Sequence, residues 1–199
     1  MNTPSHFLVN AALRKSLGYR IAIPRSAFLL GAVLPDIPLF LLAVGTFLYA
    51  RFVQGIADMR GIMNEAFDHK YFNDPLWIAS HNLLHSPTLL LIFGALLWRF
   101  RFRAGSWGMW LFWFVLGCLL HTALDIPTHV DDGPVLFFPF DWHTRFHSPI
   151  SYWDDRHYGR EFAVFELVLD VLLLGYVLLP ALRRRLARRP ATQMPAGRS

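Results

Sequence analysis

Cysteine and charged residues are scarce in this chain. Its single cysteine, Cys118, excludes an intramolecular disulfide, and the apolar residues around it indicate a packing role. Charged residues make up only 17% of the sequence, whereas hydrophobic residues make up 54% and the mean hydropathy is +0.34. These values lie outside the usual range of soluble domains. The composition therefore favours an integral membrane protein over a water-soluble bundle, and 199 residues fit a single domain.

Strand-like alternation and internal repeats are also missing, which favours an all-α fold. Four apolar runs lie at about residues 26–50, 84–99, 107–125 and 162–180, each near the ~20 residues that a bilayer crossing requires. Pro35-Asp36-Ile37-Pro38 interrupts the first run. We predict a membrane-embedded helical bundle of about four spanning helices.

An amphipathic helix is expected at residues 5–17, before the first apolar run. Thr3 or Ser5 is suited to its N-cap and Gly18 to its C-terminal stop. Residues 1–6 are polar, so we expect no cleavable signal peptide. The connections 54–80 and 128–160 are polar and rich in aromatic residues, and the second contains enough Gly, Pro and Asp to be largely loop.

Positive charge is distributed unevenly along the chain. With four spans, the N-terminal segment, the 100–105 loop with the preceding Arg99, and the C-terminal tail share one side and carry 13 of the 19 Lys and Arg residues. This bias predicts that both chain ends are cytoplasmic in a multi-pass membrane protein, and the membrane is the inner one if the protein is bacterial. Residues 1–180 then form one helical membrane domain, and 181–199 a basic tail that we expect to be disordered. No aromatic interleaving or nucleic-acid motif accompanies the arginines of the tail, so we expect no nucleic-acid partner.

Histidines and aspartates occur inside the apolar runs. His121 and Asp125 are four residues apart, which places both on one face of a helix. His81 and His85 have the same spacing before the 84–99 run, and Asp36 interrupts the first run. Unpaired polar groups are costly in such segments. We therefore expect converging helices to gather these residues into one site.

Imidazole and carboxylate groups suit a divalent metal, above all Zn²⁺, and an incomplete protein shell leaves a position for water. The metal lowers the pKa of that water and polarises a scissile group. Asp36 and Asp125, as carboxylates able to bridge ions or orient water, are the catalytic candidates. The expected activity is hydrolysis of a small-molecule or lipid ester or phosphoester beside membrane lipids. The alternative is a non-enzymatic membrane protein that uses the cluster for a structural ion, a transported ion or a proton relay.

Several short motifs occur in a recognisable order. They are Ser5-His6, Leu34-Pro35-Asp36-Ile37, His81…His85-Ser86, Leu120-His121-x3-Asp125 and Thr128…Gly133-Pro134…Leu136-Phe137-Phe138-Pro139. Over about residues 1–142 the chain thereby resembles the YdjM-type family of inner-membrane proteins, which are regarded as metal-dependent hydrolases. The resemblance implies the metal ligands His6, Asp36, His85, His121 and Asp125, with His81 nearby as a sixth candidate. The two histidines before Ser86 are one residue closer together than that family's pattern.

The order is also similar, more distantly, to that of the zinc-dependent phospholipase C and single-strand nuclease fold. That fold ends its motif series with His-x3-Glu, and His157 and Glu161 have this spacing here. A second metal at His157 and Glu161 is the corresponding expectation. The N-terminal Trp of that fold is replaced here by Met1.

Overall fold

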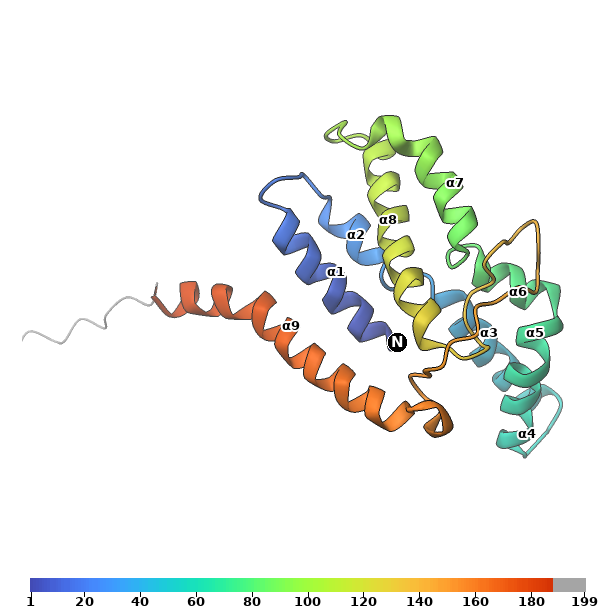
Figure 1. The fold of residues 1–199 in the computed structure, drawn as a ribbon. Helices are drawn as coiled ribbons and strands as arrows, with labels where there is room; N and C mark the ends of the chain where they lie inside the picture. The colour runs from blue at the N-terminus through green and yellow to red at the C-terminus, as the bar shows by residue number, and fades with distance from the viewer. Residues whose placement is uncertain (188–199) are drawn as a thin grey trace, which may run out of the picture.

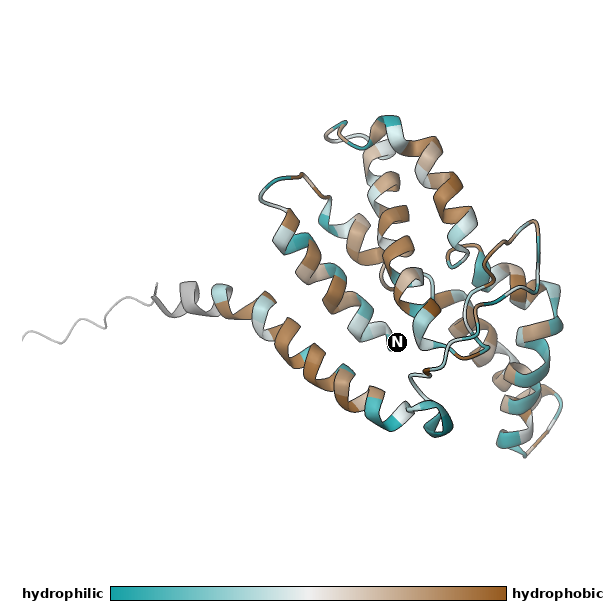
Figure 2. Ribbon diagram, in the orientation of Figure 1, coloured by the Kyte–Doolittle hydropathy of each residue, from teal (hydrophilic) through white to brown (hydrophobic). Residues whose placement is uncertain are grey.

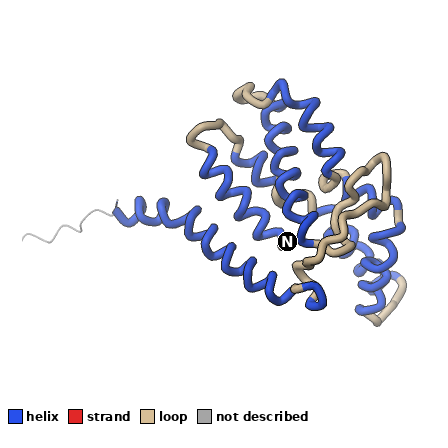
Figure 3. The backbone as a smooth tube through the Cα atoms, in the orientation of Figure 1, coloured by secondary structure: helices blue, strands red, loops and turns tan. Residues whose placement is uncertain are grey.

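A computed structural model describes residues 1–187, and within this range the protein consists of helices and loops without a strand (Figures 1 and 3). The α-helices are α1 (Thr3–Leu17), α2 (Arg25–Leu30), α3 (Ile37–Leu48), α4 (Met59–Asn64), α5 (Tyr71–Asn73), α6 (Pro75–Asn82), α7 (Pro87–Leu97), α8 (Trp107–Asp125) and α9 (Gly159–Ala187). Two π-helical segments, Tyr49–Val53 and Glu65–Lys70, and three 3-10 turns, Trp98–Phe100, Ile126–Thr128 and Asp155–His157, complete the helical content. The all-α prediction is confirmed.

Two helices are long and apolar enough to cross a membrane. They are Trp107–Thr128 and Gly159–Pro180, of 22 residues each. A third candidate is α6 together with Pro87–Phe100, but this pair is bent by 44° at its break. The structure therefore offers two or three candidate spans, and the expected number of four is not confirmed.

The first expected span, residues 26–50, is divided into α2 and α3. Between them the chain turns over residues 31–36, and Pro38 lies in the first turn of α3. Proline lacks a backbone N–H and restricts the residue before it, so it starts a helix readily and interrupts a continuous one. The apolar helix that follows, Ile37–Val53, is shorter than a span.

The helices that carry the site begin with polar N-cap residues. The side chains of Asp74, Ser86 and Ser106 accept backbone N–H groups at the starts of α6, α7 and α8, and such caps satisfy donors that have no partner within the helix. For α1 the N-cap is Asn2, without a side-chain cap bond, so the expected cap at Thr3 or Ser5 is wrong. Gly18 is the C-cap, as expected.

The two polar connections differ in structure. Residues 54–80 contain α4, α5 and most of α6, so this segment is more helical than its polarity indicated. Residues 129–158 are mostly loop, as predicted, and fold back over the ends of α6 and α8. Backbone hydrogen bonds hold this loop in place, from Tyr152 N to Thr128 O at 2.9 Å and from Ser148 N to Val130 O at 3.0 Å.

Helix α8 lies at the centre of the bundle, packed against α2 and α7, with α1 between α8 and α9 (Figure 1). Cys118 is fully buried beside Leu90 and Val115, which confirms its packing role. A close contact between backbones brings Gly31, after α2, against Gly117 of α8. Helix α9 packs on α1 and leaves most of its apolar surface exposed (Figure 2).

The bundle has two chemically different ends. At one end the amino group of Met1 lies 3.1 Å from Asp125 Oδ1, at the C-terminus of α8; we call this the metal end. At the other, the basic end, the α1–α2 turn packs beside the α7–α8 turn, and Ile23 and Met109 belong to one apolar cluster. The N-terminal residue thus lies away from the 100–105 loop, contrary to the expected grouping of these segments.

Helix α9 runs parallel to α1. Its Glu166 accepts hydrogen bonds from Asn2, and the carbonyl of Tyr176, nearer its C-terminus, accepts one from Lys15. The C-terminal part of α9 therefore points toward the basic end. Helix α9 continues to Ala187, past the expected domain boundary at residue 180, and the rest of the predicted disordered tail, 188–199, lies outside the described residues.

Candidate metal centre

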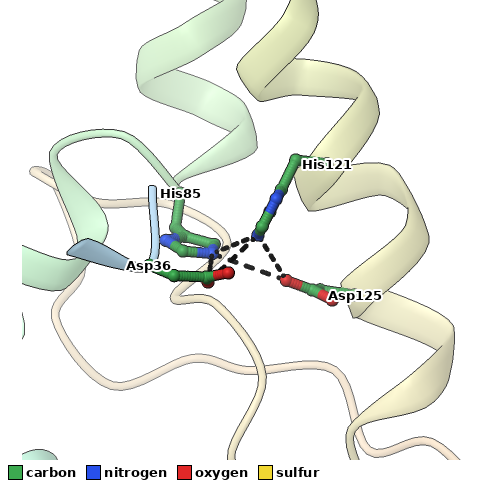
Figure 4. A group of neighbouring side chains, drawn as sticks. All are labelled: Asp36, His85, His121 and Asp125. Atoms are coloured by element: carbon green, nitrogen blue, oxygen red, sulfur yellow. Dashed lines mark hydrogen bonds and ion pairs between the residues drawn. The ribbon is translucent and has the colours of Figure 1, made fainter. Parts of the chain in front are cut away.

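Four side chains from three segments meet at the metal end (Figure 4). They are Asp36 before α3, His85 between α6 and α7, and His121 and Asp125 on one face of α8. One ligand atom of each lies within 4.8 Å of the ligand atoms of the other three. No other group of three or more potential His, Cys, Asp or Glu ligands occurs among the described residues.

The ligand atoms are close enough to share one ion. His121 Nε2 lies 2.9 Å from His85 Nε2, 2.9 Å from Asp125 Oδ2 and 3.3 Å from Asp36 Oδ1. His85 Nε2 lies 3.4 Å from Asp125 Oδ2 and 3.6 Å from Asp36 Oδ1. Zinc–ligand bonds of about 2.0–2.2 Å place ligand atoms about 3–4.5 Å apart, so a small relaxation of the shortest contacts accommodates an ion.

Backbone carbonyls determine which nitrogen of each imidazole faces the centre. His121 Nδ1 lies 2.9 Å from Ala32 O, and His85 Nδ1 lies 3.3 Å from His81 O. A carbonyl oxygen only accepts, so each Nδ1 carries the hydrogen and each Nε2 of the neutral ring presents a lone pair. Metal-binding histidines are commonly oriented in this way.

The result is a cluster of hydrogen-bond acceptors. Two imidazole lone pairs and two carboxylate oxygens converge, and with neutral rings none of these atoms supplies a hydrogen to the others. Such an arrangement is electrostatically unfavourable unless a metal cation lies between the atoms or a proton on one imidazole nitrogen joins them. These four ligand atoms therefore fit a divalent metal.

Local structure explains how each ligand reaches the centre. The turn between α2 and α3 presents Asp36, whose second oxygen accepts a hydrogen bond from the hydroxyl of Thr3. The short link between α6 and α7 presents His85, and Thr122 Oγ1 donates to the carbonyl of His85 at 2.9 Å. The interruptions of the apolar helices thus position two of the four ligands.

His6, which the family resemblance implies as a ligand, contacts the oxygen of Asp125 that does not face His85 and His121. His6 Nε2 lies 2.9 Å from Asp125 Oδ1, the oxygen that also accepts from the Met1 amino group. Burial lowers the pKa of His6, so its ring is neutral and Nε2 donates to the carboxylate. The ring also stacks on His121, with 3.7 Å between centroids. In this arrangement His6 positions two residues of the group and is not a member of it.

His81 lies behind His85 and outside the group of four. The two rings stack with 4.1 Å between centroids, and the other neighbour of His81 is the ring of Tyr71 at 5.3 Å. His81 Nδ1 is buried without a hydrogen-bond partner. His157 and Glu161 are likewise not part of the group.

Several groups outside the predicted ligand set surround the centre. His129 Nδ1 lies 3.0 Å from the carbonyl oxygen of Asp125, and Thr128 accepts a hydrogen bond from the Met1 amino group. The spacing of His129, four residues after Asp125, was the available signal. The contacts of Thr3 and Thr122 depend on the packing of distant segments, which no local pattern indicates.

The centre is accessible on one side. The side chain of Asp36 is 31% exposed, whereas those of His85, His121 and Asp125 are at most 6% exposed. Asp36 is therefore the member of the group that solvent reaches most readily.

Comparison with known proteins places the chain in a family. The family model described as YdjM inner membrane protein matches residues 1–184. No curated protein and no solved structure matches the chain. The family match includes most of α9, beyond the 1–142 region that carries the motifs. The chain belongs to the YdjM family of inner membrane proteins.

Proposed function

We propose that the protein is a membrane-bound, metal-dependent hydrolase that acts on an ester or phosphoester, with a lipid as the favoured substrate class. The observation that supports it best is the convergence of four acceptor atoms, from Asp36, His85, His121 and Asp125, with exposure at Asp36 alone. The family's location in the inner membrane supports a lipid as substrate.

Each residue has a distinct part in this proposal. His85 and His121 hold the metal through Nε2, because their Nδ1 atoms are engaged with backbone carbonyls. Asp125 is a buried ligand that His6 and the Met1 amino group hold in place. Asp36, the exposed carboxylate, orients water or substrate. When bound, a divalent metal such as Zn²⁺ supplies a Lewis acid that polarises the scissile group and makes coordinated water acidic.

One feature favours the alternative of a structural or transported ion. Four protein ligands are enough to complete a tetrahedral zinc shell, and closed shells are typical of structural sites, whereas catalytic sites keep a position for water. The two functions differ in the role of Asp36. In a hydrolase Asp36 is an exchangeable or water-orienting group, whereas in a structural site it is a fourth permanent ligand.

Metal analysis of detergent-purified protein tests both functions. We expect one equivalent of a divalent metal in the wild type, and a loss of affinity of at least about tenfold in His121→Ala. His143→Ala removes an exposed histidine of the 129–158 loop and is the matched control. Metal content near wild type in His121→Ala would show that His121 is not a ligand.

Activity separates the two functions. Turnover of phosphoester or carboxylic ester substrates by the wild type, abolished by a chelator and restored by zinc, is the expected result for a hydrolase. Asp36→Asn keeps the size of the side chain but removes its charge, so turnover falls more than metal content does. Full metal occupancy with no turnover on any ester, and a loss of thermal stability on metal removal, would support the structural alternative.

A further inference from the structure

The basic end carries arginines that alternate with aromatic residues. The α7–α8 turn reads Trp98-Arg99-Phe100-Arg101-Phe102-Arg103, and the neighbouring α1–α2 turn contributes Arg20 and Arg25. We call these eight residues the arginine collar. Trp98 is 57% exposed and Phe102 is 66% exposed, so large apolar surfaces lie open beside the charges.

The guanidinium groups of the α7–α8 turn lie over aromatic rings. Arg101 lies 4.2 Å from the ring centroid of Trp98 and 4.7 Å from that of Phe102, and Arg103 lies 5.2 Å from that of Phe100. Cation–π contacts of this kind hold the side chains in place without neutralising their charge. Arg101 Nη1 also donates to the carbonyl of Trp98 at 2.9 Å, which fixes this side chain further.

No carboxylate balances the charge of the collar. The sequence contains no Asp or Glu in residues 1–35 or 75–124. Among the described residues, ion pairs of arginine with a carboxylate occur at Arg156 and Arg160, both at the other end of the molecule. The five arginines of the collar therefore carry uncompensated positive charge.

The two turns form one surface. Trp110 Nε1 donates to Ser26 Oγ at 3.0 Å and joins α8 to α2, and Trp113 Nε1 donates to the carbonyl of Arg101 at 3.2 Å. Apolar contacts of Ile23 with α8 complete the connection. Figure 1 shows both turns at the same end of the bundle.

We propose that the arginine collar binds the phosphate-bearing headgroups of anionic membrane lipids. The collar lies where the apolar helices α7 and α8 end, which is the depth at which aromatic residues and arginines meet the headgroups. Guanidinium groups match the geometry of phosphate oxygens, and a cluster of cations beside an apolar surface is attracted to an anionic leaflet. The surface thus fits a lipid with a negative headgroup and an apolar tail, and it is independent of the metal centre.

Lipid binding by the full-length, detergent-purified protein tests this proposal. The probes are phosphatidylglycerol and phosphatidylcholine with identical acyl chains, and the readouts are the number of retained lipids in native mass spectra and the rise of the thermal unfolding midpoint. The wild type is expected to retain phosphatidylglycerol preferentially, and the preference should weaken as salt increases because screening reduces the attraction.

Two triple variants locate the site. R99Q/R101Q/R103Q removes three charges of the collar, and R51Q/R60Q/K70Q removes three charges elsewhere on the surface. Both variants keep the C-terminal arginines, so any contribution of these arginines to lipid binding is the same in the two variants. We expect the first variant to raise the apparent Kd for phosphatidylglycerol by on the order of tenfold or more and the second to leave it within about twofold.

Three outcomes would overturn the proposal. They are equal retention of the two lipids by the wild type, equal losses in the two variants, and displacement of bound phosphatidylglycerol by a short DNA duplex at physiological salt. If R99Q/R101Q/R103Q fails to fold, R20Q/R25Q on the other turn replaces it, with the same expected direction. The thermal unfolding midpoint measured without added lipid serves as the folding control for each variant.

Discussion

The two oxygens of the Asp125 carboxylate have different neighbours. Oδ2 faces the two histidines of the group, and Oδ1 accepts from His6 and from the Met1 amino group. A carboxylate held on one oxygen by two donors keeps its other oxygen directed at a metal. Groups in this supporting position tune metal affinity without being ligands.

This division of roles predicts the behaviour of variants at His6. His6→Ala should weaken zinc binding by about 10–100-fold, the range typical of outer-shell groups. His6→Gln should restore most of the affinity, because the amide nitrogen of Gln can replace Nε2 as the donor to Asp125. Competition with a chromophoric chelator measures both affinities. Complete loss of metal in both variants would instead make His6 a ligand, as the sequence resemblance implied.

At the scale of helices, the crossing of α2 and α8 holds His121 in place. A Cβ at Gly117 would lie 2.7 Å from Phe28 O and 3.1 Å from Gly31 Cα, so any larger residue forces the helices apart. The next residue after Gly31 is Ala32, whose carbonyl accepts from His121 Nδ1. Small residues commonly allow such close contacts between membrane helices.

We therefore predict that Gly117→Ala damages both stability and the metal centre. Overpacking of this kind costs about 1–3 kcal/mol, and the shift of Ala32 should weaken zinc binding as well. Thermal unfolding in detergent, with and without zinc, measures both effects.

Gly94→Ala is the matched control. Its Cβ would meet only Val115 Cγ1 at 3.9 Å, an ordinary contact, so the substitution should be neutral or slightly stabilising. Unchanged unfolding and zinc affinity in Gly117→Ala would show that the crossing does not position His121.

Helix α8 shows what the sequence predicts well. Its bounds follow from one apolar run after a serine cap, and the four-residue spacing places His121 and Asp125 together. The convergence of His85 and Asp36 on this pair is a property of packing, yet the cost of isolated polar groups in apolar segments was enough to suggest it.

Other features could not be predicted from local patterns. Pro35-Asp36-Ile37-Pro38 marked the break between α2 and α3, but hydropathy does not show how far the backbone turns there, and the four expected spans are not confirmed. The helices within 54–80 lack the apolar periodicity that identifies a helix. Sequence spacing also cannot show whether His6 binds a metal directly or contacts Oδ1 of the ligand Asp125. The answer depends on how α1 packs against α8.

At the scale of the whole molecule, the two ends differ in charge and in chemistry. The metal end carries the 129–158 loop with its aspartates, and the basic end carries the arginine collar. Helix α8 connects them, since Trp107 is at the basic end and Asp125 at the metal end. If α8 spans the membrane, the two ends face opposite sides, and the excess of Lys and Arg assigns the basic end to the cytoplasm.

Cysteine labelling tests this orientation, and the native cysteine does not interfere because Cys118 is fully buried. Ala104→Cys places a thiol in the exposed α7–α8 turn, and His143→Cys places one in the exposed loop of the metal end. A membrane-impermeant maleimide should label the first in inverted vesicles and the second in right-side-out vesicles. The wild type should stay unlabelled in both. Labelling of both thiols from the same side would mean that α8 does not cross the bilayer, and the metal centre would then face the compartment that contains the basic end.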